Sequence, residues 1–500
     1  MKEIVSVELM RKSDFAAIEG GVSGVKLMHR AAMGVYESVN WCGRVGIVCG
    51  GGNNGGDGYA LALILKEQGI ECSLIQINEN KLSTDGKYYF DRCIDAKIPT
   101  LPVEKCDFSS YNIIVDCIFG TGFCGAVLGK ERYAIEEINK SGAYVVSVDI
   151  NSGLNGDSGM CDIAVKSDIT VSVGSLKSGH FLGKAKDCIG KIVNCDIGIT
   201  LVDAPYGLIE PSDCKKAFKE RKSFSNKGDY GYIAIIGGCV EYSGAVKLAN
   251  LAVSSLKMGA GVVKLATARS LFPSVSPYLL ESTFFPLDDV DGAIVYNGEQ
   301  IDTLLRGVSA VAVGMGMGNT ENVYKILVHI LKNYDITVII DADGLNALSK
   351  YGVEILKETS CNVVLTPHPK EFERLSGICV GDVLNNPIES AKVFAKEYGC
   401  IVLLKGSATV ITDGEEAIIS SSGCSGMATA GSGDVLSGIL LGILGQTEKR
   451  ENTLSVAAGA YINGRAGEIA ENRFNSISMT SKDTVDSVRD AVCEIFSKNE

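Results

Sequence analysis

The stretch Gly423–Leu444, GCSGMATAGSGDVLSGILLGIL, joins a glycine-rich segment to one carboxylate, Asp434, and an uninterrupted apolar run. Small residues before a helix start predict a loop whose N–H groups enclose an anion, helped by the dipole of the following helix. A carboxylate repels phosphate, so Asp434 is better suited to take a proton from a hydroxyl presented beside the phosphate. A first-turn acid that only stabilises the helix is the alternative interpretation.

The composition is that of a globular protein with more than one domain. A chain of 500 residues predicts about two to four domains, and its net charge of -13 argues against nucleic-acid and anionic-membrane binding. The seventeen cysteines form no CxxC pair, and the opening MKEIVSVELMRKSD lacks the apolar segment of an export signal. Val435–Leu444 is too short to span a membrane. We therefore expect free thiols and a cytoplasmic protein without a zinc site.

The first half alternates strand and helix patterns. Residues 7–39 predict two helices, with Asp14 inside the first. A buried strand RVGIVCG, a glycine-rich loop GGNNGGDG, a helix YALALILKEQG and a strand CSLIQIN follow, which predicts a βαβ unit in a parallel sheet. The loop matches GxGxxG, but the acidic residue that a dinucleotide site needs comes late, at Glu79.

Polar side chains follow three strands of this predicted sheet. The loop after the first carries Asn53, Asn54 and Asp57; NIIVDCIFGTGFCG has Asp116 near its strand end; and AYVVSVDINSG has Asp149. Ligands bind at the carboxyl ends of parallel strands. Asn, Asp and Gly are also ordinary turn formers, but three such loops in register favour a site. The oxygen-rich side chains of these loops suit a hard cation, and the small number of carboxylates favours a monovalent ion.

The motifs GGGNNGGDG, VDCIFGTGFCG and VSVDINSG resemble the N-terminal domain of the NAD(P)H-hydrate epimerase (YjeF-type) family. The resemblance implies that Asp149 is the catalytic carboxylate and that Asn54, Asp116 and Ser152 hold K⁺. The implied substrate-binding residues are Asn53, Asn54, Gly55, Gly56, Asp57, Gly120, Thr121, Gly122, Phe123, Cys124, Gly125, Ala126 and Asp149. Asn151 replaces a usual proline and is expected to loosen its loop, and His29 and Ala32 replace a usual glutamate and glycine.

A linker with two prolines and the basic run Lys215–Lys222 places a boundary near residues 210–222. The expected domains are residues 1–213 and 222–500.

The second half also alternates buried strands and helices, which predicts a second doubly wound α/β domain. Its strands GYIAIIGG, SAVAVGMGMG, TVIIDADGLNAL, CNVVLTPHPKEF and CIVLLKGSATVIT end in Gly, Asp, His or Lys. Lys405 can neutralise a phosphate, and His368 is fixed between two prolines. Asp341 and Asp343 flank a strand end, where helix capping is the competing role.

KGxxT and GSGD together resemble the ribokinase-like superfamily, and IIGGCVEYSGAVKLA, DADGLNAL, LTPHPKEFERL and GMATAGSGDVLSGI resemble the nucleotide-dependent NAD(P)H-hydrate dehydratase. This resemblance implies ADP as the nucleotide, with Mg²⁺ accompanying it, and Asp434 as the catalytic base. It assigns nucleotide binding to Lys405, Gly406, Ser407, Ala408, Thr409 and Gly433, and substrate binding to Ala245, Gly316, His368 and Asp434. Lys370 and Ala430 stand where the family usually has glycine.

Together the resemblances predict an α/β protein with a Rossmann-like epimerase domain followed by a ribokinase-like domain. The expected function is repair of hydrated NADH and NADPH: the first half interconverts the R and S hydrates, and the second dehydrates the S form with ADP, giving AMP and phosphate. Expected partners are these small molecules and further copies of the chain, with no nucleic acid and no membrane. A ribokinase-like vitamin-precursor kinase with a nucleotide-sensing N-terminal module is the alternative.

Overall fold

The computed structural model describes residues 1–77, 82–253, 258–446 and 452–497, which form two compact units. One unit is Glu3–Tyr206, and the other is Gly207–Glu500 together with Met1–Lys2. The sequence placed the end of the first domain at residue 213, whereas contacts assign the segment from Gly207 onward to the second unit. Gly207 and Leu208 pair with Ile418 and Ile419, which explains that assignment.

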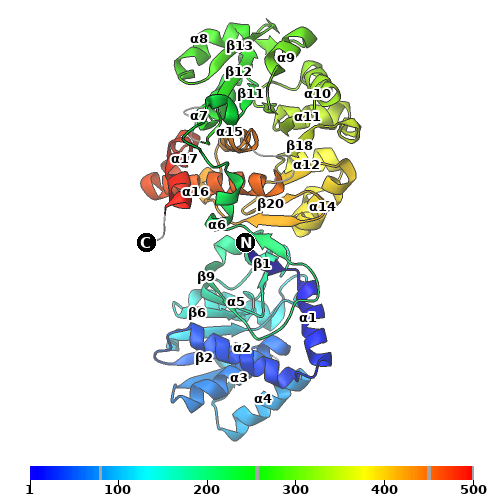
Figure 1. The fold of residues 1–500 in the computed structure, drawn as a ribbon. Coiled ribbons are helices and arrows are strands. Elements are labelled where there is room, and N and C mark those ends of the chain that lie inside the picture. The colour runs from blue at the N-terminus through cyan, green and yellow to red at the C-terminus, as the bar shows by residue number, and fades with distance from the viewer. Residues whose placement is uncertain (78–81, 254–257, 447–451, 498–500) are drawn as a thin grey trace. The chain divides into compact units, whose positions relative to one another are not determined.

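The unit Glu3–Tyr206 is built on a seven-stranded parallel sheet in the order β4-β3-β2-β5-β6-β7-β9, drawn in blue to cyan in Figure 1. Its central strands are buried at every residue because helices cover both faces, so their sequences read as continuous apolar runs. The strands are β2 Val45–Cys49, β3 Cys72–Gln76, β4 Thr100–Pro102, β5 Ile113–Cys117, β6 Tyr144–Val148, β7 Ser167–Val173 and β9 Ile189–Cys195; β1 Lys2–Val5 pairs with β8 Leu176–Lys177 apart from this sheet.

The helices of this unit are α1 Val7–Glu19, α2 Gly24–Ser38, α3 Asn53–Glu67, α4 Thr84–Asp95 and α5 Gly129–Lys140. The two helices predicted in residues 7–39 are confirmed. The glycine-rich stretch is not the long loop that the sequence suggested, because α3 begins at Asn53. Gly55 and Gly58 allow this early start: a Cβ on Gly55 would overlap the Gly50 carbonyl, and one on Gly58 would lie 2.9 Å from the Cys49 sulfur.

The strand order reverses next to β2, and this reversal positions a binding site. The chain runs from β2 outward through β3 and β4 and then returns to β5 on the other side of β2. The loops after β2 and β5 therefore diverge at the carboxyl ends of the strands. Such a switch point is where ligands bind in open α/β sheets.

The second unit contains the strand series β13-β12-β11-β16-β17-β18-β19-β20-β21-β10, drawn in green to orange in Figure 1. Pairings from β13 to β19 are parallel, and β20 forms antiparallel pairs with β19 and β21. Here the order reverses next to β11, so the loops after β11 and β16 form a second switch point. Both predicted doubly wound α/β units are thus confirmed.

The strands of this unit are β10 Tyr206–Leu208, β11 Tyr232–Ile236, β12 Val262–Ala268, β13 Thr283–Leu287, β14 Asp289–Val290, β15 Ala293–Ile294, β16 Ala310–Val313, β17 Thr337–Ile340, β18 Asn362–Leu365, β19 Ile401–Leu404, β20 Thr409–Thr412 and β21 Ala417–Ser420. Its helices are α6 Pro211–Cys214, α7 Ser243–Val253, α8 Phe272–Val275, α9 Gly298–Leu305, α10 Glu321–Asn333, α11 Asp343–Tyr351, α12 Pro369–Ser376, α13 Val380–Asn385, α14 Pro387–Tyr398, α15 Ser432–Leu444, α16 Asn452–Ser478 and α17 Ser481–Phe496. No helix among the described residues is long and apolar enough to cross a membrane.

Helix α15 lies in the core of this unit, where Val435–Leu444 is buried throughout. Gly438 allows α15 to pack closely against α7. A Cβ at Gly438 would overlap the Ala249 carbonyl oxygen and lie 2.9 Å from the Ala252 Cβ. Because α15 begins at the Gly431–Asp434 loop, this contact also fixes the loop's position.

We expect Gly438→Ala to destabilise the second unit by about 1–3 kcal/mol, because the added methyl overpacks the helix contact. Calorimetric unfolding of the full chain measures the change. Gly381→Ala is the matched control: Gly381 is also helical, and its Cβ would meet only the Cys379 sulfur at 4.0 Å. An unchanged transition in Gly438→Ala would contradict the packing role.

Candidate active sites

A cavity of 710 Å³ occupies the switch point of the N-terminal unit. Several of the predicted substrate residues line it, namely Asn53, Asn54, Asp57, Gly120, Thr121, Gly122, Phe123, Cys124 and Asp149. Gly55, Gly56, Gly125 and Ala126 are not among its lining residues. Gly55 and Gly56 are buried, and a Cβ on Gly56 would lie 2.5 Å from the Met28 methyl group, so these two glycines serve the packing of α3.

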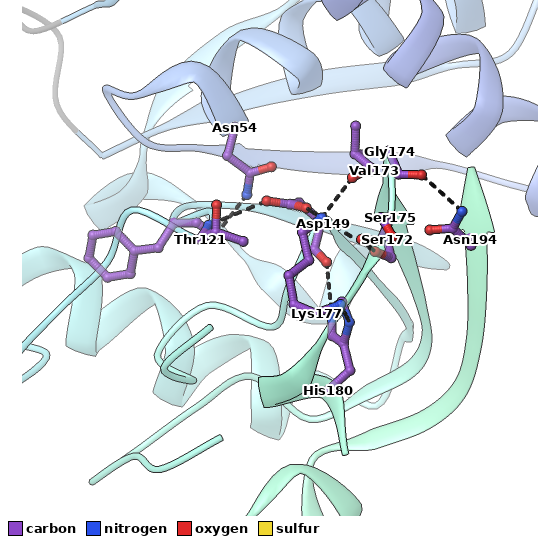
Figure 2. A network of polar contacts seen from close by, with 11 residues as sticks. Asn54, Thr121, Asp149, Ser172, Val173, Gly174, Ser175, Lys177, His180 and Asn194 are labelled. Carbon is purple, nitrogen blue, oxygen red and sulfur yellow. Dashed lines mark hydrogen bonds and ion pairs between the residues drawn. The ribbon is translucent and has the colours of Figure 1, made fainter. Parts of the chain in front are cut away.

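Asp149 lies at the cavity wall at the centre of a polar network (Figure 2). The buried Lys177 donates from Nζ to Asp149 Oδ1 at 2.5 Å and to the Val173 carbonyl at 2.7 Å. The Thr121 N–H donates to Asp149 Oδ2 at 3.3 Å. Asp149 has a φ of 67°, a left-handed conformation that is uncommon outside glycine and turns the backbone sharply after β6.

His180 holds the backbone of this network. Its Nδ1 accepts the Lys177 N–H at 3.0 Å, which leaves the proton on Nε2 to be donated to the Asp149 carbonyl at 2.8 Å. Burial and the Lys177 charge lower the pKa of His180 to about 4, so the ring is neutral. Burial alone would raise the pKa of Asp149, but Lys177 outweighs it and holds that pKa below its usual value. Asp149 is therefore ionised in the resting site at neutral pH.

The three residues that the resemblance assigned to K⁺ are linked through the Phe119 backbone, and Asn54 also lines the cavity. Asp116 is fully buried and accepts from Ser152 Oγ at 2.5 Å and from the Ser152 N–H at 2.9 Å. Asn54 donates from Nδ2 to the Phe119 carbonyl at 2.8 Å, and the buried Asn54 Oδ1 has no donor within the described residues. An unpaired amide oxygen near a buried carboxylate suits a cation better than an empty space.

Two departures from the family pattern have clear structural outcomes. The expectation that Asn151 loosens its loop is wrong: Asn151 is fully buried, and its Nδ2 donates to the carbonyls of Val165 at 2.9 Å and Cys188 at 3.0 Å. Thr170 donates to its Oδ1, so the side chain ties the loop to neighbouring segments. His29 is exposed and does not line the cavity, whereas Ala32 is buried in the core.

In the C-terminal unit, Asp434 lies in the first turn of α15. Gly431 precedes the helix with a φ of 93°, which reverses the chain so that the helix start is left open. The N–H groups of Gly433 and Asp434 have no acceptor within the described part of the chain. Unsatisfied N–H groups at a helix start are suited to bind an anion, as the sequence predicts.

Lys405 lies beside this helix start but is already paired with carboxylates. Its Nζ lies 3.2 Å from Asp341 Oδ1 and 3.8 Å from Glu371 Oε2. Ser437 of α15 donates to Asp341 Oδ2 at 2.7 Å, and a Cβ on Gly433 would lie 3.5 Å from Lys405 Nζ. Asp341 therefore joins Lys405 to α15 and is not a helix cap.

The charges around Asp434 favour proton transfer. Burial, with a further contribution from Asp341, raises the pKa of Asp434 to about 7, although Lys405 opposes this rise. Burial also lowers the pKa of His368. A carboxyl group with a pKa near neutrality is suited to act as a general base.

The remaining predicted residues of this unit divide into two groups. Ala245 and Gly316 meet at the switch point, where a Cβ on Gly316 would lie 3.0 Å from the Ala245 Cβ. Gly406, Ser407 and Ala408 form the turn between β19 and β20, and Thr409 begins β20.

His368 caps α12, with its Nδ1 accepting the Lys370 N–H at 3.1 Å. Asp343 is the first residue of α11, and it accepts the Gly318 N–H at 2.8 Å, so its side chain ties the loop after β16 to α11 and does not cap its own helix. Lys370 and Ala430 are both exposed.

Three functional residues were missed in the sequence. Lys177 lies in the two-residue strand β8, and its only signal is a lysine buried among small residues in SLKSGH. Glu371 was detectable as the third helical residue after His368, where it completes a capping box with the His368 N–H at 2.9 Å. Ser437 is one polar residue within an apolar helix, a pattern that favours a buried hydrogen bond.

Known proteins resemble both units. The YjeF-related protein N-terminus matches residues 24–179, and NAD(P)H-hydrate dehydratase matches residues 233–489. The bifunctional NAD(P)H-hydrate repair enzyme of Thermofilum pendens is 33% identical and covers 93% of this chain and 91% of its own length. The Escherichia coli enzyme of the same name is 30% identical, covering 91% and 86%.

A solved structure extends this likeness to the fold. The ADP/ATP-dependent NAD(P)H-hydrate dehydratase of Bacillus subtilis, co-crystallised with ATP and Mg²⁺, aligns with a TM-score of 0.50 at 26% identity. It covers 58% of this chain and 99% of its own length. The chain belongs to the family of bifunctional NAD(P)H-hydrate repair enzymes.

Proposed function

We propose that this chain repairs hydrated NADH and NADPH, with epimerisation in the unit Glu3–Tyr206 and ADP-dependent dehydration in the unit from Gly207 onward. The observation that carries the dehydratase assignment is Asp434, a carboxylate of raised pKa at an open helix start beside Lys405. The vitamin-precursor kinase is not favoured, because both halves match the repair family.

The dehydratase step uses the residues around the start of α15. Asp434 takes the proton of the substrate hydroxyl, which then attacks the terminal phosphoryl group of ADP. The N–H groups of Gly433 and Asp434 stabilise the negative charge of the transferred group. Phosphorylation turns a poor leaving group into a good one, so elimination restores the dihydronicotinamide. Lys405 is held by Asp341 and Glu371 and supplies a fixed positive charge next to this path.

Mg²⁺ fits this site as an ion that arrives with the nucleotide. The described residues contain no cluster of three His, Cys, Asp or Glu ligands that could hold a metal. Mg²⁺ commonly binds through substrate phosphates with only one or two carboxylates. When bound, it would neutralise phosphoryl charge and leave Asp434 to act as the base.

In the epimerase unit, we assign substrate binding to the cavity residues Asn53, Asp57 and Thr121, with Asp149 as a catalytic carboxylate. Asn54, Asp116 and Ser152 would hold K⁺, and the unpaired Asn54 Oδ1 supports this assignment. When bound, K⁺ supplies positive charge next to the buried Asp116. Free thiols at every cysteine are consistent with the cytoplasmic location that we propose.

We expect Asp434→Asn to slow dehydration of the S hydrate about 10²–10⁴-fold while ADP still binds, because Asn keeps the shape but cannot accept the proton. The return of reduced-nicotinamide absorbance with ADP measures turnover, and calorimetry measures ADP binding. The control Asp382→Asn removes an exposed first-turn carboxylate from α13. Equal losses of turnover and ADP binding would refute the base role, and a stable phosphorylated product would indicate a kinase.

The dehydration rate is expected to depend on pH through Asp434. The base must be ionised, so kcat/KM should rise with pH through about 7 and then level off. Asp341→Asn removes a negative charge that raises the pKa of Asp434, so this limb should move to lower pH. Profiles at constant ionic strength measure the shift. If the rising limb of the pH profile stays at the same pH or moves to higher pH in Asp341→Asn, a group other than Asp434 controls the rate.

K⁺ is expected to raise the unfolding temperature of the epimerase unit relative to tetramethylammonium at equal ionic strength, because binding only the folded state stabilises it. Asn54→Ala should remove this difference, since it deletes the unpaired oxygen. Asn53→Ala, at the exposed neighbouring position, should keep it. A K⁺ effect that survives in Asn54→Ala would place the ion elsewhere.

A further inference from the structure

Inverting one hydrated carbon requires groups on two faces of the ring. Water adds to an enamine with its hydroxyl on the carbon next to nitrogen. Inversion there breaks the C–O bond on one face and forms a new C–O bond on the other. The departing oxygen needs a proton, and the incoming water must lose one. A single carboxylate on one wall cannot serve both faces at once.

Helix α1 supplies a further carboxylate to the epimerase cavity, which Asp57, Asp85, Glu131 and Asp149 also line. Met10, Asp14 and Ile18 are spaced four residues apart, so they share one helical face, and all three line the cavity. Asp14 is the acidic residue on this face, between two apolar side chains.

This helix is firmly held within its own unit. The Val7 N–H donates to Asp157 Oδ1 at 2.7 Å, and the Val202 N–H donates to Ser13 Oγ at 3.3 Å. Ser13 is fully buried, and it directly precedes Asp14. These contacts fix helix α1 against the rest of its unit, and they therefore fix Asp14 at the cavity wall.

The charges in the cavity distinguish Asp14 from Asp149. Lys177 donates its hydrogen bonds to Asp149 and to the Val173 carbonyl. Asp14, in contrast, accepts no hydrogen bond within the described residues. The other charged groups facing the cavity are Arg11, Asp57, Asp85, Glu131, Asp149 and Lys177. Asp149 thus has its counter-ion and stays ionised, while Asp14 is free to carry a proton.

We propose that Asp14 is a second catalytic residue of the epimerase, the general acid that protonates the departing hydroxyl while Asp149 receives the proton of the incoming water. This inference rests on the epimerase function proposed above. It names a residue outside the stretch that matches the family's N-terminal domain, residues 24–179.

The proposed step balances in atoms and charge. The Asp14 proton goes to the hydroxyl, the C–O electron pair leaves with the oxygen as water, and the ring nitrogen lone pair forms a C=N⁺ bond. A water molecule then adds to this carbon from the opposite face, and its proton goes to Asp149. Water bonded to such a cation is strongly acidic, so even a weakly basic carboxylate accepts the proton. The reverse reaction exchanges the two roles.

The electrostatic environment supports these roles. Burial raises the pKa of Asp14 to about 6, and the negative charge of Asp149 adds to this rise. The positive charge of Lys177 opposes it. The pKa of Asp149 is lowered below its usual value, since Lys177 outweighs burial. Paired carboxylates whose pKa values are driven apart commonly divide into acid and base. The anionic Asp149 also stabilises the cationic intermediate.

The test starts from one pure hydrate epimer without ADP and follows the appearance of the other by chromatography, corrected for the spontaneous rate. We expect Asp14→Asn to slow enzymatic epimerisation about 10²–10⁴-fold. In the unaltered protein, kcat/KM should fall as pH rises above about 6, because the acid must be protonated. Asp14→Asn should lose this limb, and Asp14→Glu should restore part of the rate.

Two controls separate the possible failures. Glu19→Gln removes an exposed carboxylate from the same helix, outside the cavity, and should keep the full rate. Dehydration of the S hydrate with ADP, measured on the same Asp14→Asn chain, should be unchanged. A near-normal rate with the alkaline limb intact in Asp14→Asn overturns the role of Asp14 alone. No epimerisation by the unaltered chain would instead refute the epimerase function.

Discussion

Each unit contains a largely buried ion pair between a lysine and a strand-end aspartate, and the neighbouring chemistry depends on it. Lys177 lies 2.5 Å from Asp149 in one unit, and Lys405 lies 3.2 Å from Asp341 in the other. A buried charge without a partner is costly, so each lysine is held by its aspartate, and Lys177 also keeps the pKa of Asp149 below its usual value. The positive charge of each lysine is then largely balanced by that aspartate. The next carboxylate in each site, Asp14 or Asp434, remains in a poorly solvated place without a counter-ion of its own, and its pKa rises.

The parallel sheet brings these groups together. Asp149 and Asp341 follow directly after the parallel strands β6 and β17, so each carboxylate lies at the edge of its sheet where ligands bind. Both turns have an unusual backbone: Asp149 has a φ of 67°, and Ala342, next to Asp341, has a φ of 47°. Such conformations cost free energy and persist where the surrounding structure imposes them. At Asp149, the hydrogen bond from His180 to its carbonyl is part of that support.

The polar residues at the strand ends could be predicted from the sequence. The residues that pair with them and set their pKa values could not. The sequence pattern identified the polar residues at the ends of apolar strands, namely Asn54, Asp116 and Asp149. It also identified Asp434, which directly precedes an apolar helix. Lys177 reaches Asp149 from a strand of only two residues, which no periodicity predicts. Similarly, a polar residue in place of proline suggests a loose loop, whereas the buried Asn151 finds three acceptors that the sequence does not reveal. Burial, which raises the pKa values, is a property of packing.

Acid and base roles with pKa values this close benefit from separate pockets. Asp14 has a pKa of about 6 and Asp434 a pKa of about 7. Two such carboxylates in one pocket would share their protons and titrate as a pair, so neither could hold a fixed role. The water requirements also differ. Inversion by the route proposed here needs water as a reactant, whereas transfer of a phosphoryl group to a substrate hydroxyl must exclude water to avoid hydrolysis. Two sites on one chain satisfy both requirements, because each lysine–aspartate pair acts on the carboxylate of its own site.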